Sequence, residues 1–289
     1  MPGTKPSKMI ALAFVLVIIS AFLHALWNFT TKKVSGNLSV LYIALVFASI
    51  FLLPFAFVFI IADGIMPSSF LYILATGIVH ALYFFFLSKT YTYGNISVVY
   101  PVARGCGVIG TALIAVLTLH ESLSIVGIAG IICTSLGVLV IGSKKGDYIG
   151  YRKGLLYALL VGVTMIFYSI IDKVAMSSID PVIYIQGLFL LSMFFLTPYM
   201  FIARGGELHD AWRKHRKYSL VIGAGSAVGY LIILYVFRMA QVSYVVAVRE
   251  LSVAIGAMLG MTYLGEARSQ RKLAGIALIV AGLIMIKVA

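Results

Sequence analysis

Long apolar runs alternate with short polar gaps along the whole chain. Ten such runs lie at residues 9–31, 38–62, 69–88, 95–119, 123–142, 154–176, 181–203, 218–240, 242–264 and 271–288. A helix rises about 1.5 Å per residue, so each run is long enough to cross a hydrocarbon core of roughly 30 Å. The pattern predicts an all-α polytopic membrane protein with ten transmembrane helices and no soluble domain.

Composition and charge agree with this prediction. Of the 289 residues, 62% are apolar and only 11% are charged, against about 25% charged in ordinary soluble domains. The formal net charge is +13, but the basic residues fall mostly in the gaps, where they act as topology signals. We therefore expect a multi-pass protein of a plasma or inner membrane, surrounded by lipid and without a nucleic-acid partner.

The basic residues are unevenly shared between the two sides of the membrane. The gaps after the first, third, fifth, seventh and ninth runs, together with the adjoining ends of the runs, hold 15 Lys and Arg residues, and the other side holds 5. The positive-inside rule then places both termini outside. The two cysteines lie within apolar runs and predict neither a disulfide nor a metal site.

The second half of the chain repeats the first at a shift of 145 positions. The matched pairs are Arg104 and Arg249, Glu121 and Glu266, Gly130 and Gly275, and Gly137 and Gly282. Each half holds five runs, an odd number, so the second copy enters the membrane from the opposite side. We expect two inverted five-helix repeats, at residues 1–148 and 149–289, with a substrate site where they meet.

The end of each half resembles the end of an EamA repeat of the drug/metabolite transporter superfamily. The residues that carry the resemblance are Leu264, Gly265, Glu266, Gln270, Gly275 and Gly282, with Glu121, Gly130 and Gly137 in the first half. The resemblance covers nearly the whole chain and implies a permease with ten helices. It says little about the substrate, because members move amino acids, drugs, nucleotide sugars or other metabolites.

Two arginines lie deep within apolar runs. Arg104 is nine residues into the fourth run and Arg249 seven into the ninth, which is too deep for a side chain to reach the interface easily. A buried guanidinium normally faces a partner or a watery cavity. Its planar fork fits a carboxylate, phosphate or phosphonate, so both arginines are candidate ligands of an anionic or zwitterionic metabolite. The alternative is pairing with the Glu of the same repeat, with a carboxylate of another helix or with helix-end carbonyls.

A shift of 141 aligns two polar stripes near the starts of the halves. In the first run, His24, Trp27, Asn28 and Thr31 share one helical face, and their counterparts are Met165, Tyr168, Ser169 and Asp172. Such faces avoid lipid, and we expect them to line one cavity. The alternative is hydrogen bonding between helices, with the two aromatic residues at the membrane interface. Tyr83 and Tyr230 either line the same path or simply pack.

Glu250 and His24 are the candidate groups for proton or charge coupling, since both lie well inside apolar runs. Glu250 is otherwise a fixed counter-ion of an arginine. If it faced the cavity alone, it would suit proton-coupled efflux of cationic drugs or amines, which is the alternative function.

The chain carries no pattern typical of an enzyme. A serine elbow, a zinc-binding HExxH pair and an acidic metal cluster are all missing from the sequence. We therefore expect no catalytic residue, metal or cofactor. The predicted function is secondary transport of a small molecule by alternating access, with protons as a candidate coupling ion. The cavity would be lined by the first, third, fourth, sixth, eighth and ninth runs, in a monomer or homodimer.

Overall fold

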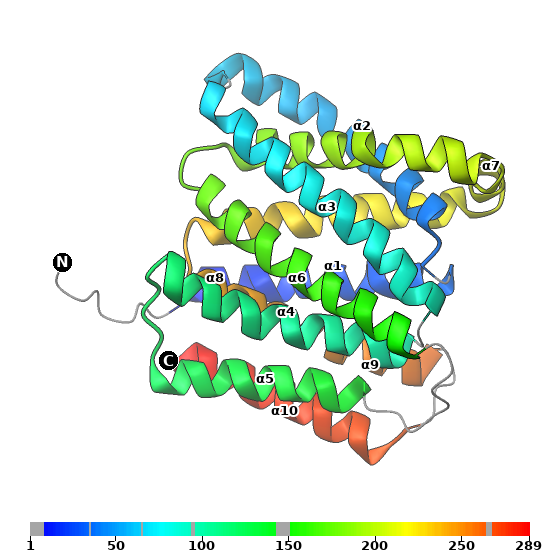
Figure 1. Cartoon of the computed structure of the whole chain (residues 1–289). Helices are drawn as coiled ribbons and strands as arrows, with labels where there is room; N and C mark the ends of the chain where they lie inside the picture. The colour runs from blue at the N-terminus through cyan, green and yellow to red at the C-terminus, as the bar shows by residue number, and fades with distance from the viewer. Residues whose placement is uncertain (1–8, 35, 65, 94–95, 143–150, 264–267) are drawn as a thin grey trace.

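Within the residues that the structure describes, the chain folds into helices and forms no strand. The computed structural model describes residues 9–34, 36–64, 66–93, 96–142, 151–263 and 268–289. The helices (Figure 1) are α1 (Ala11–Lys33), α2 (Leu38–Asp63), α3 (Pro67–Tyr93), α4 (Ile96–Thr118), α5 (Ile125–Gly142), α6 (Tyr151–Ala175), α7 (Pro181–Phe237), α8 (Val242–Arg249), α9 (Leu251–Tyr263) and α10 (Gln270–Val288). Within these described ranges, eight segments, counting α8 and α9 as one, are long and apolar enough to cross a membrane. The protein is therefore a multi-pass membrane protein.

Helix α7 spans two predicted runs, 181–203 and 218–240, and the gap between them. Its backbone leaves helical geometry at Arg204, with φ −140° and ψ 21°, and two arms run back beside each other from this kink (Figure 1). The expected gap at 204–217 is helical instead, because Arg, Lys, Glu and Ala are good helix formers whether or not the segment is apolar.

The ninth predicted run, 242–264, consists of two short helices. α8 ends at Arg249 and α9 begins at Leu251, so Glu250 lies between them in the middle of the apolar segment. Since α7 holds two arms and the ninth run is divided, the exact number of ten crossing helices remains a prediction.

The helices pack in pairs that relate the two halves. α3 packs on α6, and correspondingly α1 packs on α7, where Ser20 Oγ donates to the carbonyl oxygen of Gly229 at 2.7 Å. α4 packs on α5 and α6, while α9 packs on α10 and α1. This exchange of partners is what two inverted copies of one five-helix unit produce.

The glycines that repeat at 145 positions lie against one another where α5 crosses α10. A Cβ atom added at Gly137 would be 2.7 Å from the carbonyl oxygen of Gly275, and one added at Gly275 would be 2.7 Å from that of Gly137. Gly130 and Gly282 face each other in the same way. Without side chains at these four positions, the two backbones approach closely, as small residues commonly allow in membranes.

Candidate substrate site

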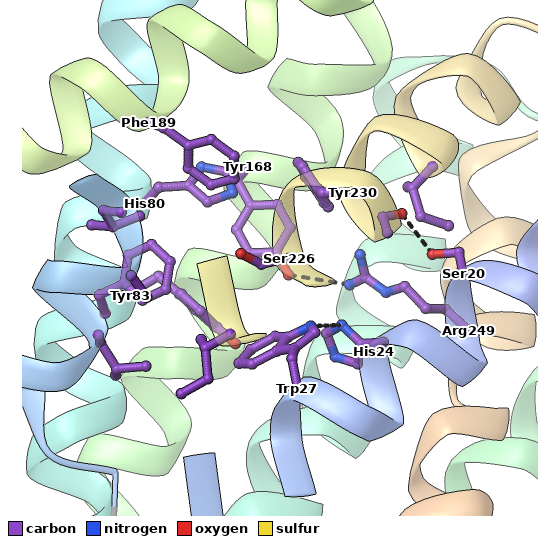
Figure 2. A pocket seen from close by; sticks show the side chains of 17 residues that line it. Ser20, His24, Trp27, His80, Tyr83, Tyr168, Phe189, Ser226, Tyr230 and Arg249 are labelled. Carbon is purple, nitrogen blue, oxygen red and sulfur yellow. Dashed lines mark hydrogen bonds between the residues drawn. The ribbon is translucent and has the colours of Figure 1, made fainter. Parts of the chain in front are cut away.

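A cavity of about 60 Å³ lies between the two halves (Figure 2). Its lining is contributed by α1, α2, α3, α6, α7 and α8, and consists of Ser20, His24, Trp27, Leu41, Ala44, Leu45, His80, Tyr83, Phe84, Tyr168, Phe189, Ile222, Ser226, Gly229, Tyr230, Ile233 and Arg249. One water needs about 10–15 Å³ on this measure, so the space holds a few waters. α2 was not among the expected lining helices, and none of the side chains that the structure describes in the expected α4 contributes to this lining.

Arg249 is the cationic side chain of this lining. It is only 2% exposed, and its guanidinium points into the space between His24 and Tyr168 (Figure 2). Nη2 donates to the hydroxyl oxygen of Tyr168 at 3.2 Å, and Nε has no hydrogen-bond partner in the described part of the chain. Among the described residues, no carboxylate oxygen lies within 4.0 Å of it. Arg249 is therefore a buried cation that faces a cavity.

Arg104 has a different environment. Nε donates to Glu250 Oε2 at 3.0 Å, and Nη2 lies 2.6 Å from Glu250 Oε1. Both side chains are buried, and neither lines the cavity. The structure thus pairs the deep arginine of the first half with the carboxylate of the second half, the cross-helix alternative that the sequence left open.

The interruption between α8 and α9 turns Arg249 and Glu250 to different sides. The amide of Glu250 donates to the carbonyl oxygen of Ala247 at 3.1 Å, and its own carbonyl oxygen accepts from Val253 at 2.8 Å. These i to i+3 bonds form a tight 3₁₀-type turn, which often marks a functional position within a helix. The turn directs Arg249 to the cavity and Glu250 to α4.

Glu121 does not pair with Arg104, contrary to one of the sequence alternatives. Its carboxylate instead accepts from the amides of Val242 at 2.6 Å and Ser243 at 3.2 Å, and from the hydroxyl of Ser243 at 2.6 Å. It caps the first turn of α8, where free amides and the helix dipole favour an anion. The repeat counterpart, Glu266, lies outside the described residues.

Aromatic rings form much of the cavity wall. Trp27 Nε1 donates to His24 Nδ1 at 3.1 Å, and His24 Nε2 is buried without a partner in the described part of the chain. The His80 ring lies with its centroid 4.4 Å from that of Tyr168 and 5.6 Å from that of Tyr230. Sequence reasoning singled out His24, Trp27 and the tyrosines, and it missed His80.

Two of the predicted site residues lie away from the cavity. Asn28 donates through Nδ2 to the carbonyl oxygen of His24 at 2.8 Å, within its own helix. Ser169 is completely buried and does not contribute to the lining. Each follows a cavity residue, Trp27 or Tyr168, by one position, and the rotation of about 100° per residue in a helix turns it to another side.

Asp172 is a buried carboxylate whose importance the sequence did not reveal. It is 0% exposed. Oδ1 accepts from Thr76 Oγ1 at 2.7 Å and from the Tyr184 hydroxyl at 2.6 Å, and Oδ2 accepts from the Tyr230 hydroxyl. No Lys, Arg or His nitrogen lies within 4.0 Å of it among the described residues. Its position in the polar stripe was the one signal, but it lies close to the end of the sixth run.

Comparison with known proteins gives the family. A comparison with curated proteins finds no match. A solved structure titled "Crystal structure of protein" is similar, with a TM-score of 0.72, 17% sequence identity and 98% of each chain covered, which supports the fold alone. The model of the EamA-like transporter family matches the chain twice, at residues 11–143 and 152–288. The chain therefore belongs to the EamA-like transporter family and is a membrane transporter of small molecules.

Proposed function

We propose that this protein carries a small anionic or zwitterionic metabolite across a plasma or inner membrane by alternating access. Arg249 binds the acidic group of the substrate. The observation that carries the proposal is the contrast between the two deep arginines, since Glu250 neutralises Arg104 while Arg249 faces the cavity.

The chemistry of the cavity supports an acidic ligand. A guanidinium in a dry, weakly polar site forms strong charge-assisted hydrogen bonds to a carboxylate or phosphate, often two at once. The Tyr168 hydroxyl oxygen already accepts a hydrogen bond from Arg249, and its own hydrogen is left to donate to a substrate oxygen. Trp27, Tyr83 and Tyr230 supply the apolar and aromatic surfaces that enclose the rest of the molecule.

The size of the cavity supports movement during transport. A space of about 60 Å³ holds waters but is too small for a metabolite of several heavy atoms. Substrate entry therefore requires the lining helices to separate. Because the lining comes from both halves, rocking of residues 1–148 against residues 149–289 would open the site to one side at a time.

Efflux of cations through Glu250 is the alternative function. Glu250 is enclosed, bound by Arg104 and outside the cavity lining. A cation that entered the cavity would meet the guanidinium of Arg249 instead. These contacts favour the anionic substrate.

A ligand-binding screen tests this proposal. The full-length protein in detergent is melted with inorganic phosphate, succinate, aspartate, glycine or tetraphenylphosphonium, because a ligand that binds the folded state raises its melting temperature. We expect stabilisation by acidic or zwitterionic probes. Arg249→Gln should weaken their binding about 10- to 150-fold, the equivalent of roughly 1.5–3 kcal/mol for hydrogen bonds to a charged group.

The matched control is Arg213→Gln, at an exposed arginine of the α7 segment far from the cavity lining. It removes one positive charge and should leave binding unchanged. Stabilisation by tetraphenylphosphonium alone, or equal affinity of the parent and Arg249→Gln for the anions, would refute the proposal.

A further inference from the structure

The buried charges at the centre of the molecule balance without a substrate. Arg104 and Glu250 form one neutral pair. Arg249 adds one positive charge and Asp172 adds one negative charge, each outside an ion pair among the described residues. A monoanion bound at Arg249 would leave this region with one excess negative charge, which is costly inside a membrane.

The hydrogen bonds around Asp172 suit a carboxyl group that gains and loses a proton. Its partners Thr76, Tyr184 and Tyr230 are all hydroxyl groups. A hydroxyl donates to a carboxylate and, after rotation, accepts from a carboxylic acid, so the same cluster satisfies both forms. Glu250, by contrast, is bound by the guanidinium of Arg104, which donates hydrogen bonds but cannot accept one from a carboxylic acid.

The same cluster is connected to the cavity. Tyr230 lines the cavity and donates its hydroxyl hydrogen to Asp172 Oδ2. His80 also lines the cavity, and its Nδ1 lies 3.0 Å from Thr76 Oγ1, which donates to Asp172 Oδ1. Two short routes, one through each oxygen, therefore lead from cavity water to the carboxylate.

We propose that Asp172 is the proton-binding site of this transporter and that one proton travels with each substrate anion. The inference rests on the proposed function of Arg249. Asp172 takes a proton from water in the cavity, one O–H bond forms on the carboxyl group, and the same proton returns to water when the site faces the other side. Glu250 and His24, the candidates from sequence, do not have this role.

Charge balance then couples the two ligands. The empty, ionised state and the state with both anion and proton have the same net charge in the buried region. A state with only one of the two carries an unbalanced charge, and its passage between outward and inward forms is disfavoured. Binding of the anion and binding of the proton must also strengthen each other equally.

Other titratable groups near Asp172 leave this assignment in place. His80 and Tyr83 lie on α3, and Tyr184 and Tyr230 lie on α7. Arg249 of α8 donates a hydrogen bond to Tyr168, which lies on α6 together with Asp172. Arg104 of α4 is turned to Glu250. The adjacent Lys173 donates to the carbonyl oxygens of Phe237 and Ala240 at the end of α7, away from the carboxylate.

The pH dependence of anion affinity tests the inference. The full-length protein is titrated between pH 6 and pH 9 with the anion that most raises its melting temperature among phosphate, succinate and aspartate. Where Asp172 is ionised in the free protein, we expect the dissociation constant to rise about tenfold per pH unit, because each anion must bring one proton. Asp172→Asn, which resembles the protonated form, should bind the anion with the same affinity at pH 6 and at pH 9, with no such slope.

Two further variants test the inference even if Asp172→Asn does not fold. Tyr184→Phe keeps the carboxyl group and removes one of its hydroxyl partners, and it should displace the pH at which the slope begins. Tyr244→Phe is the matched control, since its equally buried hydroxyl accepts from the amide of Ser124 instead. It should leave that pH unchanged.

The outcomes separate the inference from the proposed function. The same slope in Asp172→Asn as in the parent, weak binding of this variant at every pH, or no effect of Tyr184→Phe overturns the proton site while anion binding at Arg249 stands. If no anion binds, the proposed function fails. Infrared spectra of the parent and Asp172→Asn between pH 6 and pH 9 then test the proton site without an anion. The signal of a titrating carboxyl group disappears in the variant only if Asp172 binds the proton.

Discussion

Removal of one partner from the Arg104–Glu250 pair should destabilise the protein strongly. The two groups meet in two contacts, of 3.0 Å and 2.6 Å, and both side chains are at most 2% exposed. Breaking a buried pair by changing one partner typically costs about 3–5 kcal/mol, because the other charge stays buried without compensation. We therefore expect Arg104→Met to lose about this much free energy of unfolding, and Glu250→Gln to lose a similar amount.

The double variant measures how much of the lost free energy of unfolding comes from the buried charge that a single variant leaves without a partner. In Arg104→Met with Glu250→Gln neither charge of the pair remains, so its loss should be smaller than either single loss, and the coupling energy should be about 2 kcal/mol or more. Unfolding of the purified protein in mixed micelles, followed by intrinsic fluorescence, supplies the free energies. Single variants within about 1 kcal/mol of the parent, or losses that simply add, would show that the pair does not bind as the contacts indicate.

Three further predictions concern packing, capping and orientation. Gly137→Ala should lower the free energy of unfolding by about 1–3 kcal/mol, because its Cβ would lie 2.7 Å from the carbonyl oxygen of Gly275. Gly206→Ala, whose Cβ would have no atom within 4 Å, should be neutral or stabilising in the same unfolding assay. Glu121→Gln should lower stability by about 1 kcal/mol through loss of the charged cap of α8, and an unchanged midpoint would contradict this role. Reporter fusions at Ala289 should place the C-terminus outside, as the 15 to 5 bias of basic residues predicts, and a cytoplasmic signal there would refute the charge count.

Much of the fold could be predicted because hydropathy and repetition are properties of the chain itself. The rare residues that recur at 145 positions indicated two copies, and the double match to the EamA-like transporter family confirms this two-repeat layout. The interruption at Glu250 and the kink at Arg204 could not be predicted in the same way. A hydropathy window measures length and polarity, and it does not report the backbone angles of single residues.

The depth of a charged residue could be predicted from sequence, but its partner could not. Counting positions placed Arg104 and Arg249 at similar depths as candidate substrate ligands. Which of them meets Glu250 depends on the 3₁₀-type turn and on the packing of α4, and the structure gives this carboxylate to Arg104. The two arginines have similar positions in the sequence but different environments, since Arg104 is ion-paired and Arg249 faces the cavity.

Asp172 shows the limit of sequence reasoning most clearly. Three positions separate it from the end of α6, so its place in the chain suggests an interfacial carboxylate in contact with water. It is enclosed because Thr76 of α3 and, from the two arms of α7, Tyr184 and Tyr230 converge on its two oxygens. Asp172 satisfies its hydrogen bonds with hydroxyl groups, whereas Glu250 is bound by an arginine. This difference in partners, which no spacing in the chain encodes, is the physical basis for assigning the proton to Asp172 and a structural charge to Glu250.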